Sequence, residues 1–127
     1  MPERTTTKFL NVDLDLFYRS EPTELLRATK RRTLVVNLAN HFATLELWPQ
    51  PRTAEGAILR FARVVDGLPP SARAQWNCCK KRVLNIGVEA GVEPYQAVFT
   101  LPKRALARAV EIRAEIVITV YACGARG

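Results

Sequence analysis

Two stretches of alternating residues constrain the fold of this chain more than any other feature. Residues 8–15 read KFLNVDLD and residues 82–89 read RVLNIGVE, so a basic residue, an apolar residue, Leu-Asn and a closing acidic residue occur twice in the same order. Side chains of a β-strand point alternately to its two faces. Each stretch is therefore predicted to be a strand, with its Leu, Val and Ile positions in the core and its polar positions on the opposite face.

The remaining segments alternate between strand and helix patterns. Further strands are expected at TLVVNLA (33–39), FATLELW (42–48), YQAVFTL (95–101) and IVITVYA (116–122), and the strand that begins at residue 8 extends to residue 17. Asn40-His41 predicts a hairpin turn. Helices are expected over 20–32 with Ser20 as N-cap, over 54–67 with Thr53 as N-cap, as short turns within 71–79, and over 102–113 after Pro102.

This order of elements, β-α-β-β-α-β-β-α-β, predicts one α+β domain over residues 1–127, with frayed ends at 1–7 and 123–127. The expected sheet has six strands, is mixed but mostly antiparallel, and carries its helices on one face in a ferredoxin-like arrangement. Leu-Leu-Arg-Ala at 25–28 and Leu-Ala-Arg-Ala at 106–109 fall between strands in a similar way. The chain is therefore interpreted as a degenerate duplication of a β-α-β unit.

Composition indicates a cytoplasmic protein that needs no cofactor. The chain has 127 residues, of which 48% are hydrophobic and 24% charged, as in an ordinary globular domain able to bury a core. The three cysteines, Cys78, Cys79 and Cys123, form no Cys-x-x-Cys pair and suit a reducing compartment. No membrane span, signal peptide or structural zinc site is expected. A catalytic pairing of His41 with a cysteine stays open.

Strand alternation predicts an acidic open face on the sheet. The side chains expected there include Asp13, Asp15, Glu46 and Glu89, together with Trp48 and Tyr121, and no Lys or Arg. Complementary charge speeds and selects protein association, and exposed aromatic residues are common energetic anchors in interfaces. These six residues are the candidate site for binding another protein, although the same face could simply be the solvated side of an antiparallel sheet.

The net charge of +7 raises nucleic acid as an alternative partner. The residues expected to meet phosphates are the two basic runs Lys30, Arg31, Arg32 and Lys80, Lys81, Arg82. Sheet proteins that bind RNA usually place aromatic and basic residues on the open face. Because the basic runs lie elsewhere, nucleic acid is the less favoured partner.

The strands also offer a candidate ligand site and a candidate dimer contact. If the two repeated strands pair, Asp13, Asp15 and Glu89 could hold a small ligand or a divalent cation, or act as an acid and base pair. No Gly-rich loop or nucleophile accompanies them, so neither a metal nor catalytic residues are assigned. An exposed edge strand could also pair with a second copy of the chain, which makes a homodimer a further expectation.

The C-terminal segment FTLPKRALARAVEIRAEIVITVYA resembles the signature of a family of small bacterial domains of unknown function. In that signature a strand leads into a short helix and then into a closing strand that ends in a hydrophobic-x-hydrophobic-Tyr pattern. Proteins of this size and style are similar to the immunity proteins of toxin–immunity loci. The resemblance implies a non-enzymatic role in binding another protein, such as a toxin, and gives no catalytic residues. The basic charge departs from the acidic character of immunity proteins that block nucleases, so a nuclease partner is not implied.

Overall fold

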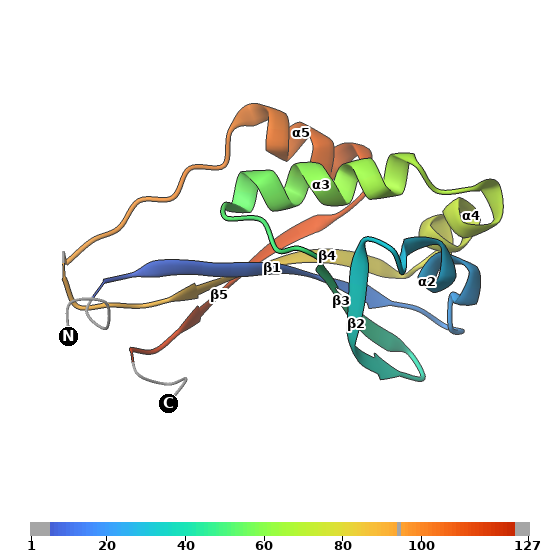
Figure 1. Ribbon diagram of the computed structural model, residues 1–127, viewed down its shortest axis with the longest axis horizontal. Helices are drawn as coiled ribbons and strands as arrows, with labels where there is room; N and C mark the ends of the chain where they lie inside the picture. The colour runs from blue at the N-terminus through green and yellow to red at the C-terminus, as the bar shows by residue number, and fades with distance from the viewer. Residues whose placement is uncertain (1–5, 94, 124–127) are drawn as a thin grey trace.

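The computed structural model describes residues 6–93 and 95–123, which form five strands and four helices (Figure 1). In chain order they are β1 (Lys8–Phe17), α2 (Thr23–Thr29), β2 (Thr33–Ala39), β3 (Phe42–Leu47), α3 (Ala54–Asp66), α4 (Pro70–Cys78), β4 (Lys81–Glu89), α5 (Lys103–Glu111) and β5 (Glu115–Tyr121). No helix among the described residues is long and apolar enough to cross a membrane. The expected frayed ends lie mostly outside the described residues, but Thr7 accepts a hydrogen bond from the backbone of Gly91 (2.8 Å).

The strands form one open sheet in the order β2-β3-β1-β4-β5. Neighbours pair antiparallel except β4 and β5, which are parallel and are joined through α5. A parallel pair needs a crossover connection, and the helix supplies it. The α+β class and the mixed, mostly antiparallel sheet are thus confirmed.

The predicted sixth strand at 95–101 is wrong. Residues 95–101 belong to no strand or helix and form the extended part of the chain that leads into α5 (Figure 1). The physical reason lies in β4, which pairs with β1 on one side and with β5 on the other. With both edges of β4 occupied, the segment that follows it has no edge on which to form a hairpin.

The two repeated sequence stretches pair with each other at the centre of the sheet. β1 and β4 are antiparallel neighbours, and Val12 lies directly opposite Ile86, its own counterpart in the repeat. Asn11 lies opposite Gly87, and Asp13 lies opposite Asn85. The repeat is thus related to itself by a local two-fold axis near the Val12–Ile86 pair. Beyond this pair the halves differ, because β3 separates β1 from β2 whereas β4 and β5 are adjacent.

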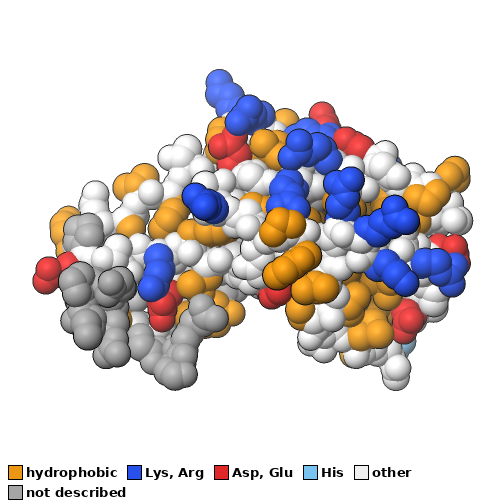
Figure 2. Space-filling model, viewed as in Figure 1, with side chains coloured by type: hydrophobic (Ala, Val, Ile, Leu, Met, Phe, Trp, Pro, Cys, Tyr) orange, Lys and Arg blue, Asp and Glu red, His pale blue; other side chains and the backbone are white. Residues whose placement is uncertain are grey.

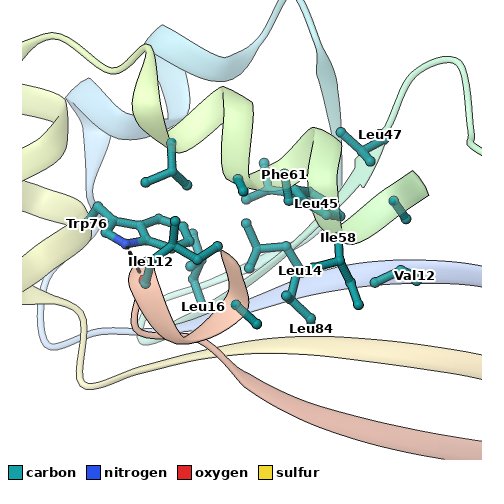
Figure 3. Close-up of a cluster of buried hydrophobic side chains, with 14 of the residues drawn as sticks. Val12, Leu14, Leu16, Leu45, Leu47, Ile58, Phe61, Trp76, Leu84 and Ile112 are labelled. Atoms are coloured by element: carbon teal, nitrogen blue, oxygen red, sulfur yellow. Dashed lines mark hydrogen bonds between the residues drawn. The ribbon is translucent and has the colours of Figure 1, made fainter. Parts of the chain in front are cut away.

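A single hydrophobic core fills the space between one face of the sheet and the helices (Figure 3). Val12, Leu14 and Leu16 of β1 and Leu84, Ile86 and Val88 of β4 are buried there, as alternation predicts. The expectation is wrong for Leu10, which is only partly buried and lies outside this core beside the register shift of β1. α3 contributes Ile58 and Phe61, which have no exposed surface. Trp76 of α4 is also buried, and its indole N–H donates to the carbonyl of Ile112 (2.9 Å). This bond joins α4 to the end of α5.

The two predicted helix caps have different outcomes. Thr53 caps α3 as predicted, because its hydroxyl accepts a hydrogen bond from the backbone N–H of Gly56 (3.0 Å). Ser20 does not cap α2, which begins at Thr23 after Pro22 and has no side-chain cap. α2 ends at Thr29, whose carbonyl accepts a hydrogen bond from the Thr33 hydroxyl (3.0 Å). The basic run that follows Thr29 is therefore a turn and not the last turn of a helix.

Candidate interaction surface on the open sheet face

Three of the predicted carboxylates lie together on the open face of the sheet. Asp13 of β1 is directly opposite Glu46 of β3, and Asp15 is directly opposite Thr44. Side chains of directly opposed residues lie within about 5.5 Å of each other at Cβ. Asp13, Asp15 and Glu46, which we name the acidic cluster, are each partly exposed.

Asp15 is held by a hydrogen-bonded network that crosses four strands. Its carboxylate accepts hydrogen bonds from the Thr44 hydroxyl (2.8 Å) and from the Asn85 amide (3.5 Å). The side-chain oxygen of Asn85 in turn accepts a hydrogen bond from the Thr119 hydroxyl on β5 (2.8 Å). A hydrogen-bonded network of this kind restricts the orientation of the side chains that it joins. The network therefore fixes the position of the Asp15 side chain in the middle of the open face.

Asp13 lies in a less favourable environment. It accepts a hydrogen bond from the Asn11 amide (3.0 Å), but partial burial, and next the charges of Glu46 and Asp15, raise the pKa of its carboxyl to about 6. Desolvation and like charges both disfavour the ionised form. At neutral pH the carboxylate is thus ionised at a cost in stability, and a nearby cation would offset that cost.

A polar hollow of about 320 Å³ lies beside the acidic cluster. Its lining residues are Leu10, Asn11, Asp13, Glu46, Gln50 and Tyr121. Gly87, the residue opposite Asn11, lets the two strands fit there, because a Cβ at position 87 would lie 2.8 Å from the Asn11 side-chain oxygen. Tyr121 is 44% exposed and lies over the same position, with its ring 3.7 Å from that Cβ. The hollow thus brings the ring of Tyr121 to two carboxylates of the acidic cluster.

Glu89 does not join the cluster, so the predicted grouping of Asp13, Asp15 and Glu89 is wrong. The residue of β4 opposite Asp13 is Asn85, and Glu89 lies four residues further on, about 13 Å along the strand. Glu89 is opposite Lys8, with 4.0 Å between the ammonium nitrogen and a carboxylate oxygen. In the described parts of the chain, no three His, Cys, Asp or Glu side chains are grouped to hold a metal ion.

Lys8 also corrects the prediction that the open face carries no Lys or Arg. The pairing of β1 with β4 shifts register between Phe9 and Asn11, where a bulge places Lys8 opposite Glu89 and packs Phe9 against the core. A bulge inserts one residue and so reverses which face the earlier side chains point to. Alternation alone cannot reveal such a change, because the sequence pattern has no gap at this position.

At the other end of β1, the open face carries an aromatic pair that is absent from the six predicted site residues. The rings of Phe17 and Phe42 are 4.9 Å apart and inclined by 56°, and the Lys81 ammonium lies 6.0 Å from the centre of the Phe17 ring. Alternation does place Phe17 on this face, so the signal is present in the sequence. Phe17 remains 36% exposed.

Trp48 lies at a corner of the sheet and not in the hollow. It follows the last residue of β3 and is 62% exposed. Its backbone N–H donates to the carbonyl of Arg32, immediately before β2 (2.9 Å). Its neighbour in space is thus the basic turn that precedes β2.

The two basic runs differ in how far their charges are engaged within the protein. Lys30, Arg31 and Arg32 are exposed in the turn before β2. In the second run, the guanidinium of Arg82 donates to the carbonyls of Trp76 (2.8 Å), Cys79 (2.9 Å) and Arg113 (3.0 Å). Arg82 therefore closes the C-terminal end of α4, as cations near helix ends commonly do.

The lone histidine and the buried Cys79 contact different backbone carbonyls. A ring nitrogen of His41 lies 2.9 Å from the carbonyl of Arg19, whereas the thiol of Cys79 is buried and donates to the carbonyl of Gln75 (3.4 Å). Burial raises the pKa of the Cys79 thiol, which disfavours the reactive thiolate.

Comparison with known proteins gives no relative for this chain. No protein-family model matches it, and no curated protein or solved structure is significantly similar to it.

Proposed function

We propose that this chain is a non-enzymatic interaction domain that binds another protein through the open face of its sheet. The observation that carries the proposal is the acidic cluster, in which Asp13 is partly buried beside Glu46 and Asp15 and its pKa is raised to about 6. Neighbouring like charges destabilise a sheet face that contacts only solvent. Solvent exposure by itself therefore does not explain why the three carboxylates are grouped. A basic partner would offset this repulsion, and the charge would steer its approach.

Aromatic side chains flank the cluster and supply apolar contact area. Tyr121 borders the hollow, and Phe17 with Phe42 lies toward the other end of the face. Buried aromatic anchors surrounded by polar contacts carry most of the binding energy in many interfaces. We assign Asp13, Asp15, Glu46 and Tyr121 to the centre of the contact surface, with Glu89 and Trp48 at its margins.

The resemblance of the C-terminal segment to small bacterial domains that are similar to immunity proteins supports a toxin with a basic contact surface as the partner.

A ferredoxin-like arrangement is also part of the proposal. It is supported by the spatial order β2-β3-β1-β4, by antiparallel pairing throughout these four strands, and by helices packed on one face.

The test is affinity capture from a lysate of the native cells, with partners identified by mass spectrometry. The wild-type chain is compared with D13N/E46Q, which removes two charges of the cluster without adding bulk. The matched control is E24Q/E111Q, which removes two carboxylates that pair with arginines on the exposed helix surface. We expect a partner that is captured by the wild type and by the control and is lost with D13N/E46Q.

Circular dichroism spectra and thermal melts of all three proteins establish that they are folded. Capture of the same proteins in the same amounts by D13N/E46Q would contradict the assignment of the open face.

A further inference from the structure

Three arginine side chains converge on a concavity on the helix-bearing side of the molecule. Arg32, Arg60, Arg63 and Val64 line this concavity, whose volume is about 300 Å³. Arg32 ends the turn before β2, and Arg60 and Arg63 are one helical turn apart on α3, so their side chains leave the helix on the same side. Figure 2 shows Lys and Arg side chains gathered over the helical part of the molecule.

Backbone contacts hold the elements of this site together. The carbonyl of Arg32 accepts a hydrogen bond from the N–H of Trp48, and the carbonyl of the following residue, Pro49, accepts one from the Arg60 guanidinium (2.7 Å). Residues 48–49 thus connect the turn before β2 to the middle of α3. Arg60 is partly buried and already oriented, which lowers the entropy cost of binding a ligand with it.

These arginines differ from several other cations of the protein in having no carboxylate partner. Ion pairs engage Lys8, Arg27, Lys81, Arg104 and Arg108 with Glu or Asp side chains. Within the part of the chain that the structure describes, none of the three arginines of the concavity forms an ion pair, and no acidic residue lines it. Lys30 and Arg31 add two further charges in the adjoining turn. A bound anion would relieve this repulsion.

The chemistry of the neighbouring residues narrows the class of anion. Guanidinium groups match phosphate geometry and bind it through paired hydrogen bonds. Trp48, whose backbone is bonded to Arg32, exposes 62% of its surface, and an exposed indole offers a stacking surface for a base. Only an unpaired base is free to stack in this way, because the bases of a duplex are stacked on each other.

We infer that Arg32, Arg60, Arg63 and Trp48 form a binding site for single-stranded nucleic acid. The arginines contact backbone phosphates, and Trp48 stacks on an adjacent base. The three arginines lie apart from the acidic cluster, and Trp48 is shared with the margin of the contact surface proposed above. The arginine site does not depend on the function proposed for the open face.

The inference is tested by fluorescence anisotropy with labelled single-stranded RNA and DNA of about 12 nucleotides, a length that spans such a site. Binding is measured between about 50 and about 200 mM salt, and three phosphate contacts predict a log-log slope of about −2. R60Q/R63Q should weaken binding about tenfold or more at low salt and reduce the slope by about 1.4. The matched control K103Q/R104Q removes two charges from α5 and should change the affinity less than about threefold.

Tryptophan fluorescence provides a second readout, because Trp48 is exposed whereas Trp76 is 1% exposed. Oligonucleotide binding should quench the emission of the wild type, and W48L should remove both the quenching and part of the affinity. The inference is overturned if R60Q/R63Q binds as the wild type does, if both double variants weaken binding equally, or if a duplex of the same sequence binds and quenches as well as the single strand. Absence of binding at low salt would also overturn it.

Discussion

Asp13 is the residue whose environment conflicts most with its charge. It is central in the sheet, its neighbours across and along the strand are acidic, and its hydrogen-bonding partner is a neutral amide. Asp15, two residues away, has two donors directed at its carboxylate. Two identical side chains on one strand thus have different hydrogen-bonding partners because of what lies on the adjacent strands.

Replacing Asp13 should change the pH dependence of stability. Its folded pKa of about 6 lies above the ordinary 3.8, so the folded state binds the proton more tightly and loses stability as pH rises from about 4 to about 6. D13N removes this loss. Because the side chain is partly exposed and screened, we expect D13N to be about 1 kcal/mol more stable than the wild type at pH 8 and nearly equal to it at pH 4.

Urea unfolding across that pH range measures the effect, with E24Q on the exposed surface of α2 as the control. If the free energies of unfolding of D13N and the wild type instead run parallel between pH 4 and pH 8, the pKa of Asp13 is not raised in the folded state.

At the scale of single elements, the ends of helices depend on local chemistry that the sequence shows only in part. Thr53 caps α3 as predicted, because it directly precedes the first helical residue and the following turn is free to form. Ser20 has the same chemistry but lies too far from Thr23, where α2 begins after Pro22. A capping residue is therefore informative only when the start of the helix is independently known.

Removing the Thr53 cap should destabilise the protein by about 1 kcal/mol, because the backbone N–H of Gly56 loses its partner. The measurement is the free energy of unfolding of T53A. T23A is the matched control, since Thr23 begins α2 without a side-chain cap and should change stability by less than about 0.5 kcal/mol. Equal losses in the two variants would indicate that helix propensity, and not the cap, is being measured.

At the scale of the whole molecule, the sheet extends beyond the layer of helices that covers it. Ile86 and Ile118 are direct partners on adjacent strands and point to the same face, yet Ile86 is 5% exposed and Ile118 is 60% exposed. α3 and α5 cover the middle of the sheet, and the linker that follows β4 passes the uncovered end (Figure 1). Burial on this face therefore depends on where the helices end as well as on strand alternation.

This difference predicts unequal effects of one substitution at two neighbouring sites. I86A should destabilise the protein by about 3 kcal/mol, because it leaves a cavity in the core. I118A removes the same atoms from an exposed edge and should cost less than about 1 kcal/mol. Thermal or chemical unfolding of the two variants measures the difference, and similar losses would mean that this end of β5 is covered in solution.

The prediction of the fold succeeds wherever a pattern is local. Alternation locates β1 with the bounds that the structure has, and the Asn40-His41 turn joins β2 to β3 as expected. The prediction for 95–101 fails because both edges of β4, the strand with which this segment was expected to form a hairpin, are paired with β1 and β5. Alternation correctly predicts that Asp13, Asp15 and Glu46 share the open face. It does not predict that Glu89 lies away from them, because that position depends on the register between β1 and β4.

The repeated stretches KFLNVDLD and RVLNIGVE by themselves determined that two strands exist and that Val12, Leu14, Leu84, Ile86 and Val88 enter the core, because alternation follows from backbone geometry. Only the tertiary structure decided that the two strands pair with each other, that a bulge turns Lys8 to the open face, and that Arg32 meets Arg60 and Arg63 at one concavity. Each of these depends on how segments distant in sequence align, and no local pattern encodes that alignment.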